Sequence, residues 1–178
     1  MVKIIIGVVV AAIVVISAFL LMDPVLQKNP IDDTSLVSTA EGITVKVEGE
    51  VTKTGSYVLK EGSLMGDLIE AAGGVTTNAD SLAYFDEAPL SNGMTYFIAS
   101  KYDVNDICNN QELKKVNINS DDVETLTTIT GFSSSVANAV VDYRNTTSMF
   151  YTIEGLLEVY GIGNATYQKV RNYVTLHN

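Results

Sequence analysis

The residues with the clearest chemical use are glycines that recur in the C-terminal third of the chain. Gly131-Phe132-Ser133 and Gly161-Ile162-Gly163 each place a large apolar residue after a glycine, and a helical pattern follows both. Glycine permits a tight turn with bare backbone, and the helix that follows begins with free N–H groups. These groups and the positive end of the helix dipole form a phosphate site. Such a contact reads backbone rather than bases, so the pattern predicts DNA binding without sequence preference.

The two turns belong to an internal repeat with an offset of 30 residues, in which Glu124–Tyr143 aligns with Glu154–Tyr173. Each unit predicts a short helix, a glycine-centred hairpin and a second helix. A lone hairpin of this kind could simply connect two helices, but two in register favour DNA contact. One unit is too small to bury its apolar face, so we expect both to pack as one all-α, four-helix domain over residues 116–178. Ser120 or Asn119 is expected to cap its first helix.

The candidate DNA-binding residues are those of the two hairpins and the basic residues that follow them. Residues 116–178 carry six acidic and three basic side chains, a local net charge of −3, whereas DNA-binding domains are generally basic. We therefore predict weak binding, in the range of about 10⁻⁴–10⁻⁶ M that is typical of non-specific contacts. The predicted DNA-binding residues are Gly131, Phe132, Ser133, Ser134, Ser135, Arg144, Gly161, Ile162, Gly163, Asn164, Lys169 and Arg171.

The composition argues against most enzymes and against a globally basic nucleic-acid binder. Lys and Arg number 11 against 21 Asp and Glu, which gives a net charge of −10. One cysteine, Cys108, and one histidine, His177, disfavour a cysteine-rich zinc site, a catalytic triad and a multi-histidine metal site. A nuclease is a distant alternative, because no spacing gathers several carboxylates convincingly. We expect a binding protein without enzymatic activity, cofactor or metal.

An uncharged apolar run of 19 residues, Ile4–Met22, predicts a transmembrane anchor over residues 1–22. As a helix it would be about 28 Å long, close to the hydrocarbon thickness of a bilayer. A cleaved signal peptide is the alternative, but its apolar core would usually be shorter. We expect a single-pass protein of the cell membrane, with a cytoplasmic N-terminus and an extracellular bulk. The acidic, proline-containing residues 23–42 then form a linker.

Residues 43–100 predict a small α+β domain. Ile43, Val45 and Val47 alternate with polar residues, as in a half-buried strand, and a second strand around Val58 completes a hairpin. A helix over residues 64–72 ends at two glycines, and residues 94–99 form a closing strand. Residues 101–115, which include Cys108, predict a second linker. We expect Cys108 to be a free thiol, with an intermolecular disulfide as the alternative.

Two resemblances rest on these segments. The pattern V-x-G-x-V-x-x-x-G-x-Y that starts at Val47, followed by D-L-I-E-A-A-G-G, resembles an SLBB domain, a β-grasp-like module. Residues 116–178, with VNIN, the two hairpins, DYR and F-x-T-I-E-G-L-L-E-V-x-G-I-G, resemble the tandem helix-hairpin-helix domain of ComEA-type competence proteins. The first hairpin departs from that family, because serines stand where a second glycine and lysines are usual. The order of anchor, linker, SLBB and helix-hairpin-helix domains also resembles that family.

The resemblance implies a membrane-tethered receptor that captures double-stranded DNA during natural transformation, together with other DNA-uptake components. The alternative is a surface interaction or assembly protein, whose SLBB domain binds saccharide or another copy of itself while the helical domain has lost DNA binding. The loss of glycine and lysine after Phe132 favours the alternative. The intact second hairpin and the domain order favour the receptor.

Overall fold

The computed structural model describes residues 42–103 and 112–178. The predicted transmembrane anchor, the first linker up to residue 41 and Cys108 lie outside these residues, and Gly42 is the only residue of that linker that is described. Within the two described ranges, no helix is long and apolar enough to cross a membrane. The fold class is α+β, with a three-stranded sheet, a two-stranded sheet and several short helices.

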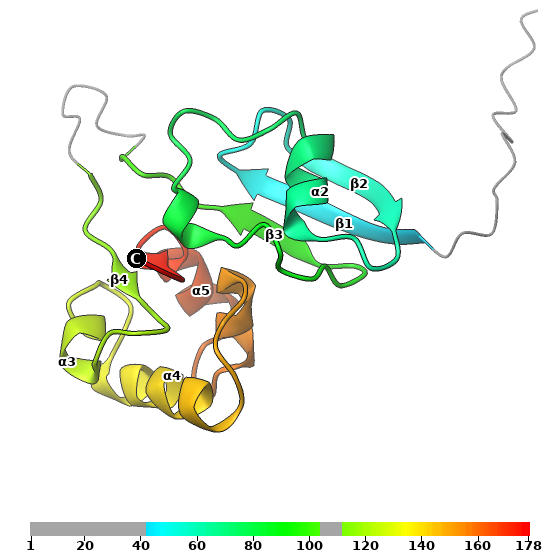
Figure 1. Ribbon diagram of the computed structural model, residues 1–178. Helices are drawn as coiled ribbons and strands as arrows, with labels where there is room; N and C mark the ends of the chain where they lie inside the picture. The colour runs from blue at the N-terminus through cyan, green and yellow to red at the C-terminus, as the bar shows by residue number, and fades with distance from the viewer. Residues whose placement is uncertain (1–41, 104–111) are drawn as a thin grey trace, which may run out of the picture. The chain divides into compact units, whose positions relative to one another are not determined.

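A three-stranded sheet forms the first half of the described chain (Figure 1). Its strands are β1 (Gly42–Gly49), β2 (Gly55–Lys60) and β3 (Thr95–Ile98), in the order β2-β1-β3. β1 pairs antiparallel with β2 and parallel with β3. The predicted alternation is confirmed, because Ile43, Val45 and Val47 are buried while the residues between them are more exposed.

One helix, α2 (Met65–Ala71), packs its buried face against this sheet and confirms the helix predicted there. Leu68, which is fully buried, lies in the same core as Val45 and Val47. The helix ends as the two glycines predict. Gly73 and Gly74 have φ angles of +82° and +87°, and their N–H groups donate to Glu70 and Ile69. A 3-10 turn, η1 (Ser81–Ala83), leads toward β3.

The second half contains the expected helical pairs, with differences. The elements are α3 (Val123–Leu126), α4 (Ser134–Thr146), η2 (Ile153–Glu158) and α5 (Asn164–Val170). The first helix of the second unit, η2, is a 3-10 helix. The N-cap of α3 is Asp122, whose carboxylate accepts the N–H of Thr125 at 2.8 Å, so the prediction of Ser120 or Asn119 was wrong.

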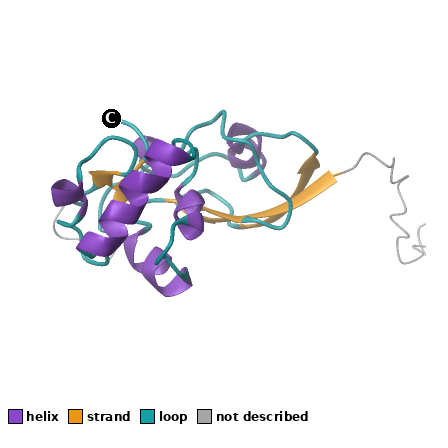
Figure 2. Ribbon diagram, turned by 90° about the horizontal axis from the view of Figure 1, so that it is seen from below, coloured by secondary structure: helices purple, strands orange, loops and turns teal. Residues whose placement is uncertain are grey.

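The all-α prediction for this part was also wrong. β4 (Val116–Asn117) and β5 (Val174–Thr175) form a parallel pair that joins the two ends of residues 116–178, shown in orange beside the helices in Figure 2. The N–H of Val116 donates to Tyr173 and that of Ile118 to Thr175, each at 3.0 Å. Two-residue strands are too short to show a period, so a search for helical spacing does not find them.

The described residues form one compact unit with two hydrophobic cores, one under the sheet and one among the helices. Phe85 packs against both cores, and Phe97 of β3 packs against the helical core. The described ends of the predicted second linker are held in place. Lys101 pairs with Glu112 at 2.9 Å, and Lys115 pairs with Asp80 at 2.6 Å.

Gly49, at the end of β1, provides a test of the sheet geometry. Its φ is +85°, and a Cβ there would lie 2.1 Å from the carbonyl oxygen of Ile98. Gly62 has a similar φ of +82° but nothing within 4 Å of a Cβ. We expect Gly62→Ala to cost only the left-handed strain, about 1–2 kcal/mol. Gly49→Ala should lower the free energy of unfolding by about 1–3 kcal/mol more than Gly62→Ala does, because the added Cβ overpacks the site. Urea unfolding of residues 40–178 measures both, and equal losses would contradict the close approach.

Candidate nucleic-acid interface

The first hairpin exposes its backbone and buries its apolar residue. Gly131 has a φ of +118° and is exposed, while the Phe132 side chain is 5% exposed and belongs to the helical core. Ser133, Ser134 and Ser135 are all exposed. The Ser133 hydroxyl accepts the N–H of Val136 at 3.3 Å and so caps α4. Ser133 therefore supports the start of the helix, and all three serines are exposed to solvent, where a ligand could meet them.

The second hairpin repeats this arrangement with a barer backbone. Gly161 has a φ of +90°, and Ile162 is 5% exposed in the same core as Phe132. Gly163 is the N-cap of α5 and has no side chain to cap it. Asn164 is exposed, and a Cβ built on Gly163 would meet nothing within 4 Å. Both the backbone and the space above it are thus open to a phosphate group.

Each hairpin packs against the second helix of the other unit. A Cβ on Gly131 would lie 2.7 Å from Cγ1 of Val170 and 3.7 Å from Cβ of Lys169 on α5. A Cβ on Gly161 would lie 3.7 Å from Cγ2 of Val136 on α4. The two repeat units therefore form one body, and the structure brings Lys169 to the first hairpin.

Arg144 is separate from the hairpins. It lies ten residues beyond the start of α4, which is about 15 Å along the helix. Its guanidinium donates to the backbone oxygens of Ile118 at 2.8 Å, Asp121 at 2.6 Å and Ser120 at 3.5 Å. These bonds hold the turn that joins β4 to α3, so the structure gives Arg144 a role within the fold.

Arg171 is also engaged inside the compact unit. Its guanidinium lies 3.8 Å from the ring centroid of Phe97 and 3.4 Å from a carboxylate oxygen of Glu48. Lys46 contacts the same carboxylate at 2.8 Å, and its hydrogen bond is the main cause that lowers the pKa of Glu48. Lys169, in contrast, is exposed and forms no ion pair with any described residue.

A buried carboxylate, which the sequence did not single out, joins the helices to the sheet. Glu154 is 4% exposed, and one of its oxygens accepts the N–H of Phe97 at 2.8 Å and the hydroxyl of Tyr167 at 2.7 Å. Burial raises the pKa of Glu154, and burial together with this carboxylate raises the pKa of Tyr167. Its repeat partner Glu124 is exposed, so no local pattern distinguishes the two.

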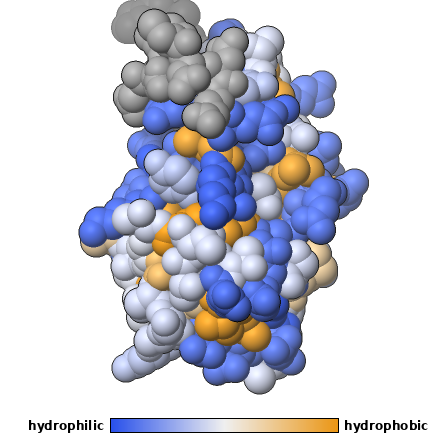
Figure 3. Space-filling model, turned by 90° about the vertical axis from the view of Figure 1, so that its left-hand side faces the viewer, coloured by the Kyte–Doolittle hydropathy of each residue, from blue (hydrophilic) through white to orange (hydrophobic). Residues whose placement is uncertain are grey.

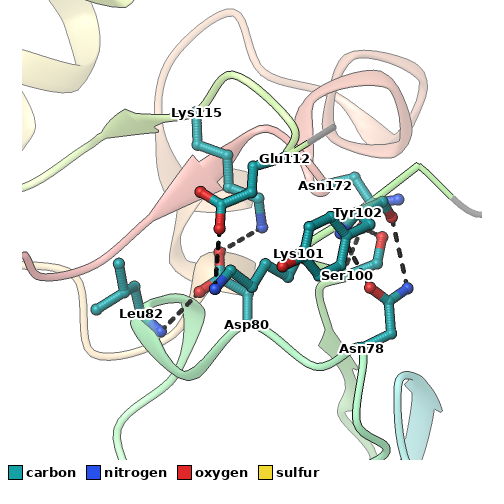
Figure 4. A network of polar contacts seen from close by, with 9 residues as sticks. All are labelled: Asn78, Asp80, Leu82, Ser100, Lys101, Tyr102, Glu112, Lys115 and Asn172. Carbon is teal, nitrogen blue, oxygen red and sulfur yellow. Dashed lines mark hydrogen bonds and ion pairs between the residues drawn. The ribbon is translucent and has the colours of Figure 1, made fainter. Parts of the chain in front are cut away.

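A second buried polar cluster connects the same two parts (Figure 4). Lys115 and Asp80 form an ion pair whose side chains are 8% and 9% exposed. Burial lowers the pKa of Lys115, while the carboxylate of Asp80 opposes that shift. Asn172 accepts the N–H of Ser100 at 3.1 Å.

The surface of the protein mixes polar areas with small, separate apolar spots on the face that Figure 3 shows. In the ranges that the structure covers, no group of three acidic, histidine or cysteine side chains is placed to hold a metal.

Comparisons with known proteins agree with this division. A helix-hairpin-helix motif model matches residues 111–175, and an SLBB domain model matches residues 44–96. The chain is 27% identical over 171 residues to "ComE operon protein 1" of Bacillus subtilis (strain 168). The match covers 86% of this chain and 83% of the relative. These matches confirm the resemblance to ComEA-type competence proteins.

The burial of Glu154 predicts a pH-dependent stability. Because its pKa is higher in the folded protein than in the unfolded chain, the folded state holds this proton more tightly. The contribution of the carboxyl group to stability is therefore greatest below the unfolded pKa and is lost as pH rises through the folded pKa. Glu154→Gln keeps an oxygen for Phe97 and Tyr167 but does not titrate.

We expect the free energy of unfolding of Glu154→Gln to increase relative to that of the unsubstituted protein as pH rises from 4 to 7. The gain has an upper limit of about 1.4 kcal/mol per pH unit. Urea unfolding at several pH values measures it. Glu124→Gln makes the same substitution at the exposed repeat partner and is the matched control. A difference for Glu154→Gln that stayed constant with pH would contradict the raised pKa.

Proposed function

We propose that this ComEA-type chain is a membrane-anchored receptor that binds double-stranded DNA without sequence preference during DNA uptake in natural transformation. The similarity to a ComE operon protein and the helix-hairpin-helix match support a DNA-binding competence role. The apolar run Ile4–Met22 supports a single-pass anchor with a cytoplasmic N-terminus and an extracellular bulk. Other components of the DNA-uptake machinery would be its partners.

The observation that carries the proposal is the pair of exposed hairpin tips. Gly131, Gly161 and Gly163 present bare backbone, and Phe132 and Ile162 anchor the two tips in one core. This anchoring fixes the tips relative to each other, so that both can meet the phosphates of one duplex. Contacts of exposed N–H groups and serine hydroxyls with phosphates position the duplex but carry no base information.

The charge of the helical part sets the expected strength. With Arg144 and Arg171 engaged inside the fold, Lys169 is the one basic residue of 116–178 left at a hairpin. Few phosphates are then neutralised, which agrees with an affinity of about 10⁻⁴–10⁻⁶ M for non-specific contacts. Many receptors tethered to one membrane would hold a long duplex far more tightly through avidity.

Gly163→Glu tests the proposal without disturbing the fold. Gly163 has a φ of −94° and open space around it, so either a glutamate or a glutamine side chain fits. Glutamate would repel a phosphate at the second hairpin, while Gly163→Gln adds the same bulk without charge. We expect Gly163→Glu to weaken binding at least tenfold, about 1.4 kcal/mol, and more than Gly163→Gln does.

The measurement is fluorescence anisotropy of labelled duplexes of several sequences, titrated with the full chain in detergent micelles at several salt concentrations. Binding should be salt-sensitive and equal across sequences. Affinity that persisted unchanged in Gly163→Glu would place the DNA surface elsewhere. A strong dependence on sequence would contradict backbone recognition.

A second candidate function, self-association through the SLBB domain, is favoured by the open edge of the sheet. β2 is an edge strand, and Val58 on it is 77% exposed. An edge strand with an exposed apolar side chain is a template for pairing with another chain.

If β2 mediates assembly, Val58→Glu should reduce the mass of the protein measured by light scattering in detergent micelles. Thr125→Glu adds the same charge at an exposed position of α3 and serves as the control. A mass that is already monomeric without substitution, or unchanged by Val58→Glu, would exclude assembly through this strand.

A further inference from the structure

A pocket of about 480 Å³ opens beside the first hairpin. Three segments form it: the residues before β4, the turn that follows α3, and the end of α5 with the residues that lead to β5. Its walls carry two lysines, three hydroxyl-bearing residues and one buried isoleucine, namely Lys114, Lys169, Thr128, Thr130, Tyr173 and Ile129.

The pocket is part of the first hairpin's surroundings. Thr128–Thr130 lead directly into Gly131, and Gly131 lies so close to α5 that a Cβ on it would be 3.7 Å from Cβ of Lys169. Lys169 therefore belongs to the second repeat unit in sequence but to the first hairpin in space. Lys114 reaches the same pocket from outside the repeat, because β4 returns beside β5.

The chemistry of the pocket suits an anion. Lys114 and Lys169 are both exposed and form no ion pair with a described residue, whereas Lys46, Lys101, Lys115 and Arg171 each pair with a carboxylate. No Asp or Glu of the described ranges lines the pocket. The Thr130 and Tyr173 hydroxyls add donors without charge. Two lysines that pair with no described carboxylate line one concave site, and no described acidic residue lines it, which matches a phosphodiester group.

We propose that this pocket binds a backbone phosphate of the DNA that lies on the first hairpin. Lys114 and Lys169 then supply the positive charge that Ser133–Ser135 do not. This inference rests on the proposed DNA-binding function and assigns it a second basic residue, Lys114, which lies before the repeat. The first hairpin then binds DNA with lysines that neighbouring segments provide.

The salt dependence of binding measures the number of such contacts. Each phosphate contact contributes about 0.9 to the slope of log K against log salt. We expect Lys114→Gln and Lys169→Gln each to reduce the magnitude of the slope by about 0.9, and the double variant by about 1.8. If the variants and the unsubstituted protein bind DNA equally at 1 M salt, the affinity at 0.1 M salt falls about eightfold for each single variant and about sixtyfold for the double variant.

Lys60→Gln is the matched control. Lys60 is an exposed lysine on β2 without an ion-pair partner in the described ranges, so its loss changes the net charge equally but at the sheet. Lys114→Arg keeps the charge and should retain the slope of the unsubstituted protein. The titrations use the full chain in detergent micelles and labelled duplex DNA, and circular dichroism verifies that each variant is folded.

The outcomes separate this inference from the proposed function. If the unsubstituted protein binds DNA and Gly163→Glu weakens it, but both lysine variants behave as Lys60→Gln does, the pocket is not a phosphate site and the receptor function stands. If the unsubstituted protein does not bind DNA at any salt concentration, both proposals fail. A slope reduced by the pocket variants but not by Lys60→Gln supports the pocket as a DNA contact.

Discussion

The hydrogen bond from the N–H of Phe97 to the buried carboxylate of Glu154 is the contact on which the arrangement of the described chain depends. β3 is an edge strand, and its outer N–H group needs an acceptor once the helices cover it. Glu154 provides that acceptor and, through the same oxygen, holds Tyr167 of α5. A carboxylate with 4% exposure is costly, and its raised pKa reflects that cost. The bond closes the sheet edge and orients α5, which begins directly after the second hairpin.

Basic residues in the helical part divide between holding the fold and facing outward. Arg144 binds three carbonyl oxygens of the β4–α3 turn, and Arg171 lies on Phe97 beside Glu48. Guanidinium groups suit these positions because they offer several donors in a fixed plane. Lysine, with a point charge on a flexible stem, remains at the exposed pocket in Lys114 and Lys169. The two arginines thus hold internal geometry, while Lys114 and Lys169 line the pocket beside the first hairpin. Lys115 is the exception among these lysines, because it is buried in its ion pair with Asp80.

Short-range patterns predicted the α+β elements well and long-range contacts poorly. The alternation of apolar and polar residues predicted β1, and helical spacing followed by two glycines predicted α2. The 30-residue repeat predicted both hairpins. Nothing local separates Glu154 from Glu124, although one is buried and the other exposed, because burial depends on where β3 arrives. The β4–β5 pair and the partners of Arg144 were missed for the same reason. Lys114 was predicted to lie in a linker, and the pairing of β4 with β5 brings it to the same pocket as Lys169.

The charge of a domain is a poor measure of the charge of its binding face. Residues 116–178 sum to −3, yet several of their carboxylates are already engaged. Glu154 is buried, Asp122 caps α3, Asp121 accepts the N–H of Asn117, and Glu158 accepts the hydroxyl of Tyr143. None of these four lines the pocket beside the first hairpin, where both charged side chains are lysines. Repulsion from exposed carboxylates falls off over a Debye length of about 8–10 Å. The charge of the pocket is therefore set by the side chains that line it, which are Lys169 and, from just before this part of the chain, Lys114, and not by the sum over residues 116–178.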